Sequence, residues 1–340
     1  MPTSSHAQSD LDAKLRAIEL DLQSTISVLD HPSTRSMGDM VRHHFGWSRG
    51  ESSVRGKRVR PLLTLLMCEA CEGDWRRALR AASAVELIHN FSLVHDDIED
   101  QSETRRGRPT LWKLNGIPQA INTGDALFVL SHLTLYRSQE LGVPTERILQ
   151  VERILAEACL NLTIGQHLDL VFEHRADVTE EEYSFMVQGK TSSLLSAATS
   201  SGAVLAGAAE DVVSHASNFG MHLGNAFQAL DDILGIWGCP QTTGKPASDD
   251  LLLRKKTLPV LVGLKRSAAF TDLWRSAEMS SALIHDMVSH LESSGSLEYT
   301  QQVAQRHTDS ALEALHSAAP PSPARGELEA LAVRLLSRQA

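Results

Sequence analysis

Segments with the periodicity of an α-helix follow one another along almost the whole chain, and this pattern constrains the fold more than any other feature. Several alternating β-branched runs with turn signals, which would mark a sheet, do not occur. Helices are expected at residues 10–29, 75–102, 145–173 and 210–237, with a short last one at 327–338. The sequence therefore predicts an all-α fold, with about ten or more helices in one bundle.

Caps and loops mark where these helices begin and end. Asp74 can cap the helix at 75–102, and Thr179 forms a capping-box pattern with Glu182 in "DVTEEEY". Because no long flexible linker separates two halves, we expect residues 1–9 to be disordered and residues 10–340 to form a single domain. Loops or linkers rich in Gly, Ser or Pro are expected at residues 47–61, with Pro61 in the first turn of the next helix, and at 238–250 and 318–327.

The composition excludes some classes of function. The formal net charge of −10 argues against general nucleic-acid binding, which needs a basic face. No apolar run approaches the roughly 18 residues of a membrane span, and the first ten residues do not resemble a signal peptide. Four cysteines in this length favour a reduced, cytoplasmic setting. Cys68 and Cys71 form a CxxC without a second pair, so we interpret them as packed helix residues rather than a zinc or redox site.

Four acidic residues lie within five positions of the stretch "LVHDDIEDQSETRRGRPT". On a helix, Asp96 and Asp100 share one face, Asp97 flanks Asp96, and His89 lies two turns earlier on the same side. A charged run is most often a solvated face, but such a face usually mixes signs, whereas this pair is purely acidic and ends an apolar stretch. Carboxylates in this arrangement, together with a substrate phosphate, suit Mg²⁺.

A second acidic pair, Asp231 and Asp232, follows another apolar stretch in "GNAFQALDDILGIWG". Gln228 lies three residues before Asp231 on the same face. Two acidic pairs on apolar helices can face each other across a bundle core, as in other metal sites of helical bundles. Taken together, the two pairs predict a divalent-metal site.

Basic residues alternate with these acids along the chain, and together they suit a polyphosphate. Arg can grip phosphate with two parallel hydrogen bonds, and Lys acts as a mobile point charge. Each one taken alone is most simply a surface cation. The residues singled out are Lys57, Arg60, Arg105, Arg106, Lys190, Lys245 and Lys255.

At these motifs the sequence resembles the trans-isoprenyl diphosphate synthases, the head-to-tail polyprenyl synthase family. The matching pieces, in chain order, are "GKRVRP", "LIHNFSLVHDDIEDQSETRRGRPT", "NTGDALF", "GQHLDL", "GKTSSL", "FQALDDILG" and "TGKPASDDLLLRKKTLP". They span roughly residues 45–265, and their order, spacing and number are far more specific than a lone DDxxD. The resemblance implies an all-α bundle around a deep cavity, usually as a homodimer.

The resemblance also implies a role for each matching residue. Mg²⁺, as three ions bound with the substrate diphosphate, would be held by Asp96, Asp97, Asp100, Asp231 and Asp232. The allylic diphosphate would be bound by Arg105, Lys190, Lys245 and Lys255. The diphosphate of isopentenyl diphosphate would be bound by Lys57, Arg60, His89 and Arg106. Gln166 and Gln228 would line the reaction centre, and Thr191 would orient the developing cation.

One departure from the family pattern concerns the second acidic pair. The family commonly has DDxxD there, but this chain has "DDILG", so Gly235 stands one turn after Asp231 where a third acid is expected. Some bacterial members resemble this sequence in carrying Gly there. Asp249 or Asp250 could supply the missing carboxylate, and a plain loop charge is the simpler interpretation.

The length of the product is expected to depend on Phe91. It precedes Asp96 by five residues, so it lies about 7.5 Å down the helix. In the family, large side chains near here form the floor of the elongation cavity, so Phe91 should block long products while Ser92 leaves room beside it; mere core packing is the alternative for Phe91. With the short DDIED spacing, the chain is most like a bacterial geranylgeranyl diphosphate synthase, and farnesyl diphosphate is the alternative product.

Three other functions fit the same motifs less well. A terpene cyclase on this fold ionises one diphosphate and needs no second diphosphate site, yet all four residues assigned to that site are present. A non-catalytic partner subunit should lack metal ligands, and only the acid at the Gly235 position is missing. A helical scaffold without a ligand would leave the paired acids and bases unexplained.

Overall fold

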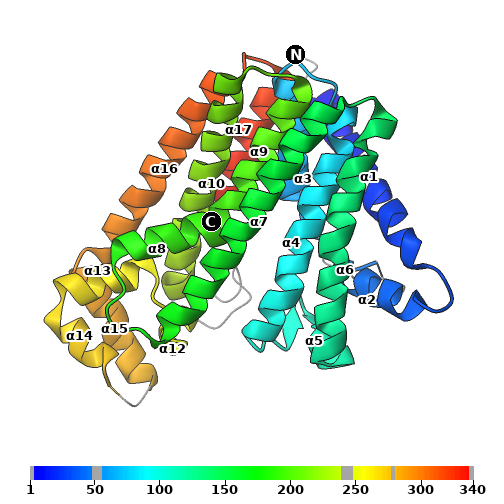
Figure 1. Ribbon diagram of the computed structural model, residues 1–340. Helices are drawn as coiled ribbons and strands as arrows, with labels where there is room; N and C mark the ends of the chain where they lie inside the picture. Colours follow the sequence, from blue (N-terminus) through cyan, green and yellow to red (C-terminus); the bar gives the residue numbers. More distant parts are fainter. Residues whose placement is uncertain (1–3, 48–55, 239–247, 277–279, 337–340) are drawn as a thin grey trace. The chain divides into compact units, whose positions relative to one another are not determined.

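The structure, a computed structural model, describes residues 4–47, 56–238, 248–276 and 280–336 (Figure 1). In these residues the all-α prediction is confirmed, with one short hairpin as the exception. The first half of the chain forms the helices α1 (Ser4–Ile26), η1 (Ser27–Leu29), α2 (Arg35–Phe45), α3 (Val59–Ala70), η2 (Trp75–Ala78), α4 (Leu79–Glu99), α5 (Leu111–Asn115), α6 (Ile117–Tyr136) and η3 (Arg137–Leu141). The second half forms α7 (Thr145–His174), α8 (Glu180–Val187), η4 (Gln188–Ser192), α9 (Ser193–Ala206), α10 (Glu210–Trp237), α12 (Asp249–Leu252), α13 (Leu258–Arg266), α14 (Ala268–Trp274), α15 (Ser281–Ser293), α16 (Ser296–Ala318) and α17 (Pro323–Leu336).

Contacts between Cα atoms divide the chain into two compact units. The first unit comprises Met1–Glu157, Ala197–Ala216 and Ala318–Leu328. The second unit comprises Ala158–Ser196, Ser217–Ser317 and Glu329–Ala340. The single domain expected from the sequence stays a prediction.

The first unit is built around α4, which packs along α6 (Figure 1) and also contacts α1 and α3. The first turns of α4 are small and buried, with Ala81, Ala82 and Ala84 all fully inaccessible. Small side chains at a helix contact allow the shorter interaxial distances, which fall between about 8 and 10 Å. This packing holds the helix whose last turn carries the first acidic cluster.

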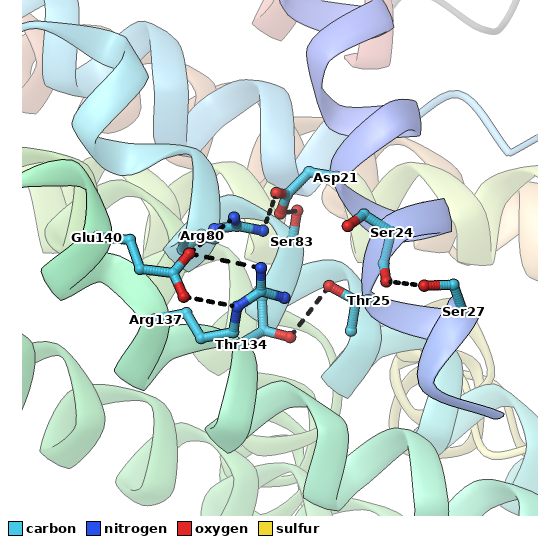
Figure 2. Close-up of polar contacts among 9 residues, drawn as sticks. All are labelled: Asp21, Ser24, Thr25, Ser27, Arg80, Ser83, Thr134, Arg137 and Glu140. Carbon is cyan, nitrogen blue, oxygen red and sulfur yellow. Dashed lines mark hydrogen bonds and ion pairs between the residues drawn. The ribbon is translucent and has the colours of Figure 1, made fainter.

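Polar side chains fix α1 to α4 and η3 within the same unit (Figure 2). Asp21 of α1 accepts hydrogen bonds from Arg80 and, at 2.6 Å, from Ser83 Oγ of α4. Arg80 Nη2 also donates to Glu140 Oε2 of η3 at 3.3 Å. Burial raises the pKa of the Asp21 carboxyl, although Ser83 and Arg80 act in the opposite direction. The two hydrogen bonds therefore offset part of the cost of burying this carboxylate.

A two-stranded hairpin follows α4, and the sequence analysis missed it. β1 (Thr104–Arg105) pairs antiparallel with β2 (Arg108–Pro109), and the two-residue loop has positive φ angles of 53° at Arg106 and 74° at Gly107. Such loops favour Asn-Gly, and a left-handed conformation costs a residue like Arg roughly 1–2 kcal/mol. Strands of two residues are too short for an alternating pattern to be recognised. The turn has Arg106 where Asn or Asp would be the usual sequence signal, so the turn was not predicted either.

Arg108 anchors this hairpin to α2. Its Nη2 donates to the carbonyl oxygen of His44 at 3.1 Å, in the last turn of α2, where a positive charge is stabilising. Gly46 leaves room for the guanidinium, because a Cβ on Gly46 would lie 2.1 Å from Arg108 Nη1. The hairpin, which also carries Arg105 and Arg106, is thereby held against α2.

Three glycines bring the central helices of the second unit into close contact around η4, a single π-helical turn. A Cβ on Gly165 of α7 would lie 2.2 Å from the backbone nitrogen of Lys190, and a Cβ on Gly189 would lie 2.6 Å from the carbonyl oxygen of Asn161. Gly224 of α10 lies equally close to Ser192. The helical pattern that follows the Thr179 capping box predicts one continuous helix through "MVQGKTSSLLSAATSSGAVLAGA". The structure instead interrupts it with a π turn, a feature often found at functional sites.

Helix boundaries agree with the expectation at several ends and differ at others. The capping box is confirmed, with Glu182 N donating to Thr179 Oγ1 at 3.1 Å and Thr179 N donating to Glu182 Oε2 at 3.0 Å. The linker expected over 318–327 is wrong from Pro323 onward, because Ser322 Oγ accepts from Arg325 N and starts α17 there. α1 begins at Ser4, six residues before the expected start.

The described cysteines are free thiols. Burial raises the pKa of Cys68 to about 12 and that of Cys71 and Cys159 to about 11. Thiols that ionise so reluctantly are poor nucleophiles and poor metal ligands, in agreement with a packing role for the CxxC. No described helix is both long enough and apolar enough to cross a membrane.

Candidate functional site

The first acidic cluster lies where α4 ends in the first unit. Asp96 and Asp97 belong to the last turn of α4, and Asp100 is its C-cap. The side chain of Asp97 is only 3% exposed and that of Asp96 is 19% exposed, whereas Asp100 is exposed. Neighbouring residues of a helix point about 100° apart, so the two adjacent acids have different environments.

Arg105 of the hairpin bridges these two aspartates. Its Nη2 donates to Asp96 Oδ2 at 2.8 Å, and its Nε donates to Asp97 Oδ1 at 2.7 Å. Burial raises the pKa of the Asp97 carboxyl to about 6, although the Arg105 guanidinium acts in the opposite direction. The guanidinium thus neutralises carboxylates that the sequence analysis assigned to metal.

A group of buried and half-buried basic side chains lies around α3, α4 and the hairpin. Arg60 Nη1 lies 3.3 Å from His89 Nε2, so the two residues that the resemblance assigns to one diphosphate are in contact. Burial and the neighbouring Arg60 lower the pKa of His89 well below its ordinary value. Burial, followed by Arg105, lowers the pKa of His44 to about 3. Both imidazoles are therefore neutral among guanidinium groups.

Several of these buried nitrogens lack a hydrogen-bond partner among the described residues. They are His44 Nε2, Arg58 Nη2, Arg60 Nε and Arg108 Nη1. A buried polar atom without a partner costs about 1–3 kcal/mol, so such atoms call for a ligand or ordered water. A polyanion with many acceptor oxygens would satisfy donors of this kind.

Sequence analysis missed the carboxylates that hold this basic group in place. Glu86 is 3% exposed; it accepts from Arg58 Nη1 at 2.9 Å and from Asn90 Nδ2 at 3.0 Å. Glu19 accepts from Arg58 Nε at 2.6 Å. A single acid inside the apolar run "AASAVELI" was the available signal for Glu86, because an acid is rarely buried without a partner.

The other expected residues of the first unit take different positions. Lys57 and Arg106 are exposed, and Ser92 is half-buried with its Oγ bonded to the carbonyl oxygen of His89 at 2.8 Å. Phe91 packs against Phe128 of α6, with ring centroids 5.2 Å apart. Phe91 therefore points toward α6, where it forms part of an aromatic contact between the two helices.

In the second unit the close helix contact at η4 brings four expected polar residues onto neighbouring turns. Thr191 Oγ1 donates to Gln228 Oε1 at 2.9 Å, and Lys190 pairs with Asp169 of α7. Gln166 lies half-buried one turn before Asp169 on the same helix. Asp169 belongs to the matched piece "GQHLDL", yet the sequence analysis assigned it no role.

The second acidic pair consists of one exposed and one buried acid. Asp231 is exposed, whereas Asp232 is 2% exposed and accepts from Tyr183 Oη, from Leu258 N at 2.9 Å and from Gln228 Nε2 at 3.0 Å. Burial raises the pKa of Asp232 to about 7, although Tyr183 and Gln228 act in the opposite direction. In this arrangement Asp232 joins α8, α10 and α13.

Asp250 of α12 occupies the space beside the glycine that interrupts the second acidic motif. A Cβ on Gly235 would lie 1.9 Å from Asp250 Oδ2 and 2.5 Å from its Cγ, and Asp250 is 9% exposed. A carboxylate thus lies where the side chain of a third acid would begin. Lys255 is half-buried after α12, and its backbone nitrogen donates to Asp250 O at 2.8 Å. Lys245 lies outside the described residues.

The donors suit a hard cation, but they are engaged by the protein itself. In the described ranges no group of three or more His, Cys, Asp or Glu side chains is arranged as a metal site. Arg105 bridges Asp96 and Asp97, and three protein donors surround Asp232. Carboxylate oxygens are the ligands that Mg²⁺ prefers. The first unit offers those of Asp96 and Asp97, and the second unit offers those of Asp231 and, beside Gly235, of Asp250. In chemical type the acids of each unit therefore fit the ion.

The chain is similar to proteins of one family in both sequence and structure. Residues 50–290 match the family model described as "Polyprenyl synthetase". Two proteins of Mycobacterium tuberculosis are each 37% identical to this chain. The match to a (2E,6E)-farnesyl diphosphate synthase covers 91% of this chain and 90% of that protein. The match to a geranylgeranyl diphosphate synthase covers 89% of this chain and 87% of that protein.

Solved structures agree with this result. A polyprenyl synthetase from Streptomyces coelicolor A3(2) is 36% identical, with a TM-score of 0.85 over 96% of this chain and 99% of that one. A geranylgeranyl pyrophosphate synthetase from Pyrococcus horikoshii Ot3 is 33% identical, with a TM-score of 0.86 over 97% and 98%. The likeness extends over nearly the full length of both structures.

Proposed function

Because this chain belongs to the polyprenyl synthetase family and is a prenyltransferase, we propose that it condenses isopentenyl diphosphate head-to-tail with an allylic diphosphate. The observation that carries this proposal is the group of basic side chains, His44, Arg58, Arg60 and Arg108, each of which has a buried nitrogen without a hydrogen-bond partner among the described residues. It lies in the same unit as Asp96 and Asp97 and is suited to a diphosphate. A chain that only packed helices together would leave these donors unexplained.

In this proposal the chain supplies binding, orientation and a dry site. Mg²⁺, when bound, adds positive charge that stabilises the departing diphosphate. Arg105 and Lys190, with Lys245 and Lys255, grip the allylic diphosphate, while Lys57, Arg60, His89 and Arg106 hold isopentenyl diphosphate. Thr191 and Gln228, hydrogen-bonded to each other at 2.9 Å, face the carbon that becomes cationic. Water must be excluded there, since it would capture the cation before the double bond does.

We favour condensation over cyclisation because two diphosphates need two basic sites. Arg60 and His89, both assigned to the second diphosphate, are in contact at 3.3 Å. Glu86 maintains the neighbouring Arg58 in its buried position. A cyclase would have no use for this second set of donors.

The product proposed is geranylgeranyl diphosphate, with farnesyl diphosphate as the alternative. The contact between Phe91 and Phe128 supports a closed floor below the first acidic cluster. The names of the relatives do not separate the two products, because a farnesyl and a geranylgeranyl diphosphate synthase of one organism are equally similar to this chain.

We also propose a homodimer in the cytoplasm. Apolar side chains of α6 are exposed in two groups on either side of the exposed Asp125: Ile117 with Ile121, and Val129 with Leu133 and Tyr136. Exposed apolar groups of this kind suit a second copy of the chain. The free thiols agree with a reducing compartment. Light scattering should give twice the chain mass, and Leu133→Glu should reduce it to the monomer mass.

One assay tests the reaction. The protein is incubated with Mg²⁺, isopentenyl diphosphate and an allylic diphosphate, and we expect both substrates to be consumed with release of diphosphate and formation of a longer chain. Consumption of the allylic diphosphate alone, with a hydrocarbon or alcohol as product, would refute condensation. Asp96→Ala should abolish turnover while the circular dichroism spectrum remains helical.

A further inference from the structure

We propose that Arg105 acts as a built-in counter-ion that occupies Asp96 and Asp97 until a diphosphate arrives, so that the metal binds these acids only together with the diphosphate. This inference rests on the proposed function and concerns the same site. It assigns Arg105 two successive partners, first the carboxylates and then the diphosphate. The resemblance assigns only the second.

The geometry shows how completely Arg105 engages the acidic pair. Two different nitrogens of one guanidinium each bind a different aspartate, at 2.8 Å to Asp96 Oδ2 and at 2.7 Å to Asp97 Oδ1. Both distances are typical of strong, charge-assisted hydrogen bonds. One oxygen of each carboxylate is engaged in this way, so a cation that is to be coordinated by both of these oxygens competes with the guanidinium for them.

The surroundings of Arg105 favour an exchange over a permanent pair. Its side chain is 29% exposed, so it is not locked into the core, and it belongs to a strand of only two residues. A pocket beside it is lined by His44, Arg106 and Arg108 as well as by Asp97. A diphosphate that reaches the basic side chains around this pocket can take over Arg105, because a guanidinium grips phosphate as well as it grips carboxylate.

The exchange also improves the compensation of charge at the acids. Without ligand, one guanidinium offsets only part of the charge of the two neighbouring carboxylates in a partly buried place. With ligand, the negative diphosphate draws Arg105 away, and a divalent cation compensates the freed acids. Metal and diphosphate therefore help each other bind, and this coupling is the same in both directions.

Metal binding without substrate tests the proposal most directly. Mn²⁺, a spectroscopic substitute for Mg²⁺, is titrated into the protein and followed by electron paramagnetic resonance, first alone and then with inorganic pyrophosphate. The variants are Arg105→Gln, Arg105→Lys and, as a control, Lys113→Gln. Lys113 is an exposed cation that pairs with Glu103 rather than with the aspartates.

We expect Arg105→Gln to bind Mn²⁺ alone about tenfold more tightly than the natural protein, since two charge-assisted hydrogen bonds no longer compete. The same variant should lose most of the gain in Mn²⁺ affinity that pyrophosphate gives to the natural protein. Lys113→Gln should change neither. Arg105→Lys should fall in between, because it keeps the charge and lacks the fork.

Two results would overturn the inference. One is that Arg105→Gln, shown by thermal melting to be folded, binds Mn²⁺ alone with the same affinity as the natural protein. The other is an equal gain in Lys113→Gln, which would reveal a general charge effect. If Arg105→Gln does not fold, the affinity of Arg105→Lys for Mn²⁺ alone is the test. An affinity no higher than that of the natural protein would then contradict the exchange. Failure of the condensation assay would refute the proposed function instead, since these titrations need no turnover.

Discussion

Adjacent aspartates in each acidic motif differ sharply in environment, although the sequence presents them as equals. Asp97 and Asp232 are buried and carry pKa values raised to about 6 and about 7 by that burial. Asp231 is exposed, and Asp96 is partly exposed. Protein donors offset only part of the cost of burying each of these charges. Among the acids proposed to bind a cation, Asp96 and Asp231 are therefore the more accessible from solvent.

The space beside Gly235 leads to a prediction about Asp250. Asp250→Ala should raise the Mg²⁺ concentration needed for half-maximal turnover, because it removes the carboxylate next to the missing third acid. Gly235→Asp alone should destabilise the fold by about 1–3 kcal/mol, since its Cβ would lie 1.9 Å from Asp250 Oδ2. The double variant, Gly235→Asp with Asp250→Ala, should have the stability and the Mg²⁺ requirement of the natural protein. Urea unfolding measures the first and Mg²⁺ titration of activity measures the second.

The double variant supplies its own control. If the effects of the two single changes simply add in the double variant, the two positions do not share one space. A Mg²⁺ requirement that is unchanged in Asp250→Ala would show that Asp250 is a plain loop charge. Asp249→Ala, on the same short helix, serves as the matched substitution.

A second residue-scale prediction concerns product length. Phe91→Ala should lengthen the product by at least one five-carbon unit, because it removes a ring packed 5.2 Å from that of Phe128. The measurement is chromatography of the dephosphorylated products. Phe185→Ala, at an exposed position of α8, should leave the distribution unchanged. An identical distribution for both variants would assign Phe91 to packing alone.

At the scale of elements, the sequence predicts long helices well and their interruptions poorly. The helix at 210–237 and the Thr179 capping box are as expected, since periodicity and caps are local signals. The β1–β2 hairpin and the π turn η4 were missed, because each depends on contacts with distant residues such as Gly46 and Gly165. Motif residues were found by their likeness to a family. The partners of those residues, such as Glu86 and Tyr183, required the structure.

The contact between α7 and η4 can be tested through Gly165. Gly165→Ala should destabilise the protein by about 1–3 kcal/mol and lower turnover, because the new Cβ would lie 2.2 Å from the backbone nitrogen of Lys190. Thermal melting and kcat are the measurements. Gly326→Ala in α17, with nothing within 4 Å of its Cβ, should instead stabilise by about 0.5–1 kcal/mol. Equal effects at the two positions would contradict a tight crossing at Gly165.

At the scale of the whole molecule, the basic group in the first unit predicts how stability depends on pH. Folding lowers the pKa of His44 from near 6.5 to about 3, so between these values the unfolded chain binds more protons than the folded one. The free energy of unfolding should therefore decrease as the pH falls below about 6.5. The loss is at most about 1.4 kcal/mol per pH unit for each such histidine. Urea unfolding between pH 5 and pH 7.5 measures it.

Comparison of variants isolates this effect. Asp97 and Asp232 act in the opposite sense, since an acid whose pKa is raised on folding costs stability as the pH rises from 3.8 toward its folded value of about 6 or about 7. His44→Gln should therefore reduce the loss of stability toward acid, and the exposed His31→Gln should not. Equal slopes for the natural protein and His44→Gln would show that His44 is protonated in the folded state.

The anchoring of α1 has a consequence for shortening the chain. Lys14 is fully buried and pairs with Glu69 at 2.8 Å, Glu19 neutralises the buried Arg58, and Asp21 binds Arg80. Deleting α1 would remove one of the two acidic partners of the buried Arg58 and of Arg80, although the helix carries none of the matched motifs. A truncation that stops before Asp10 spares all three pairs. The first helix therefore helps to hold the basic side chains that we propose for the diphosphate, and we expect a minimal active version of this protein to require it.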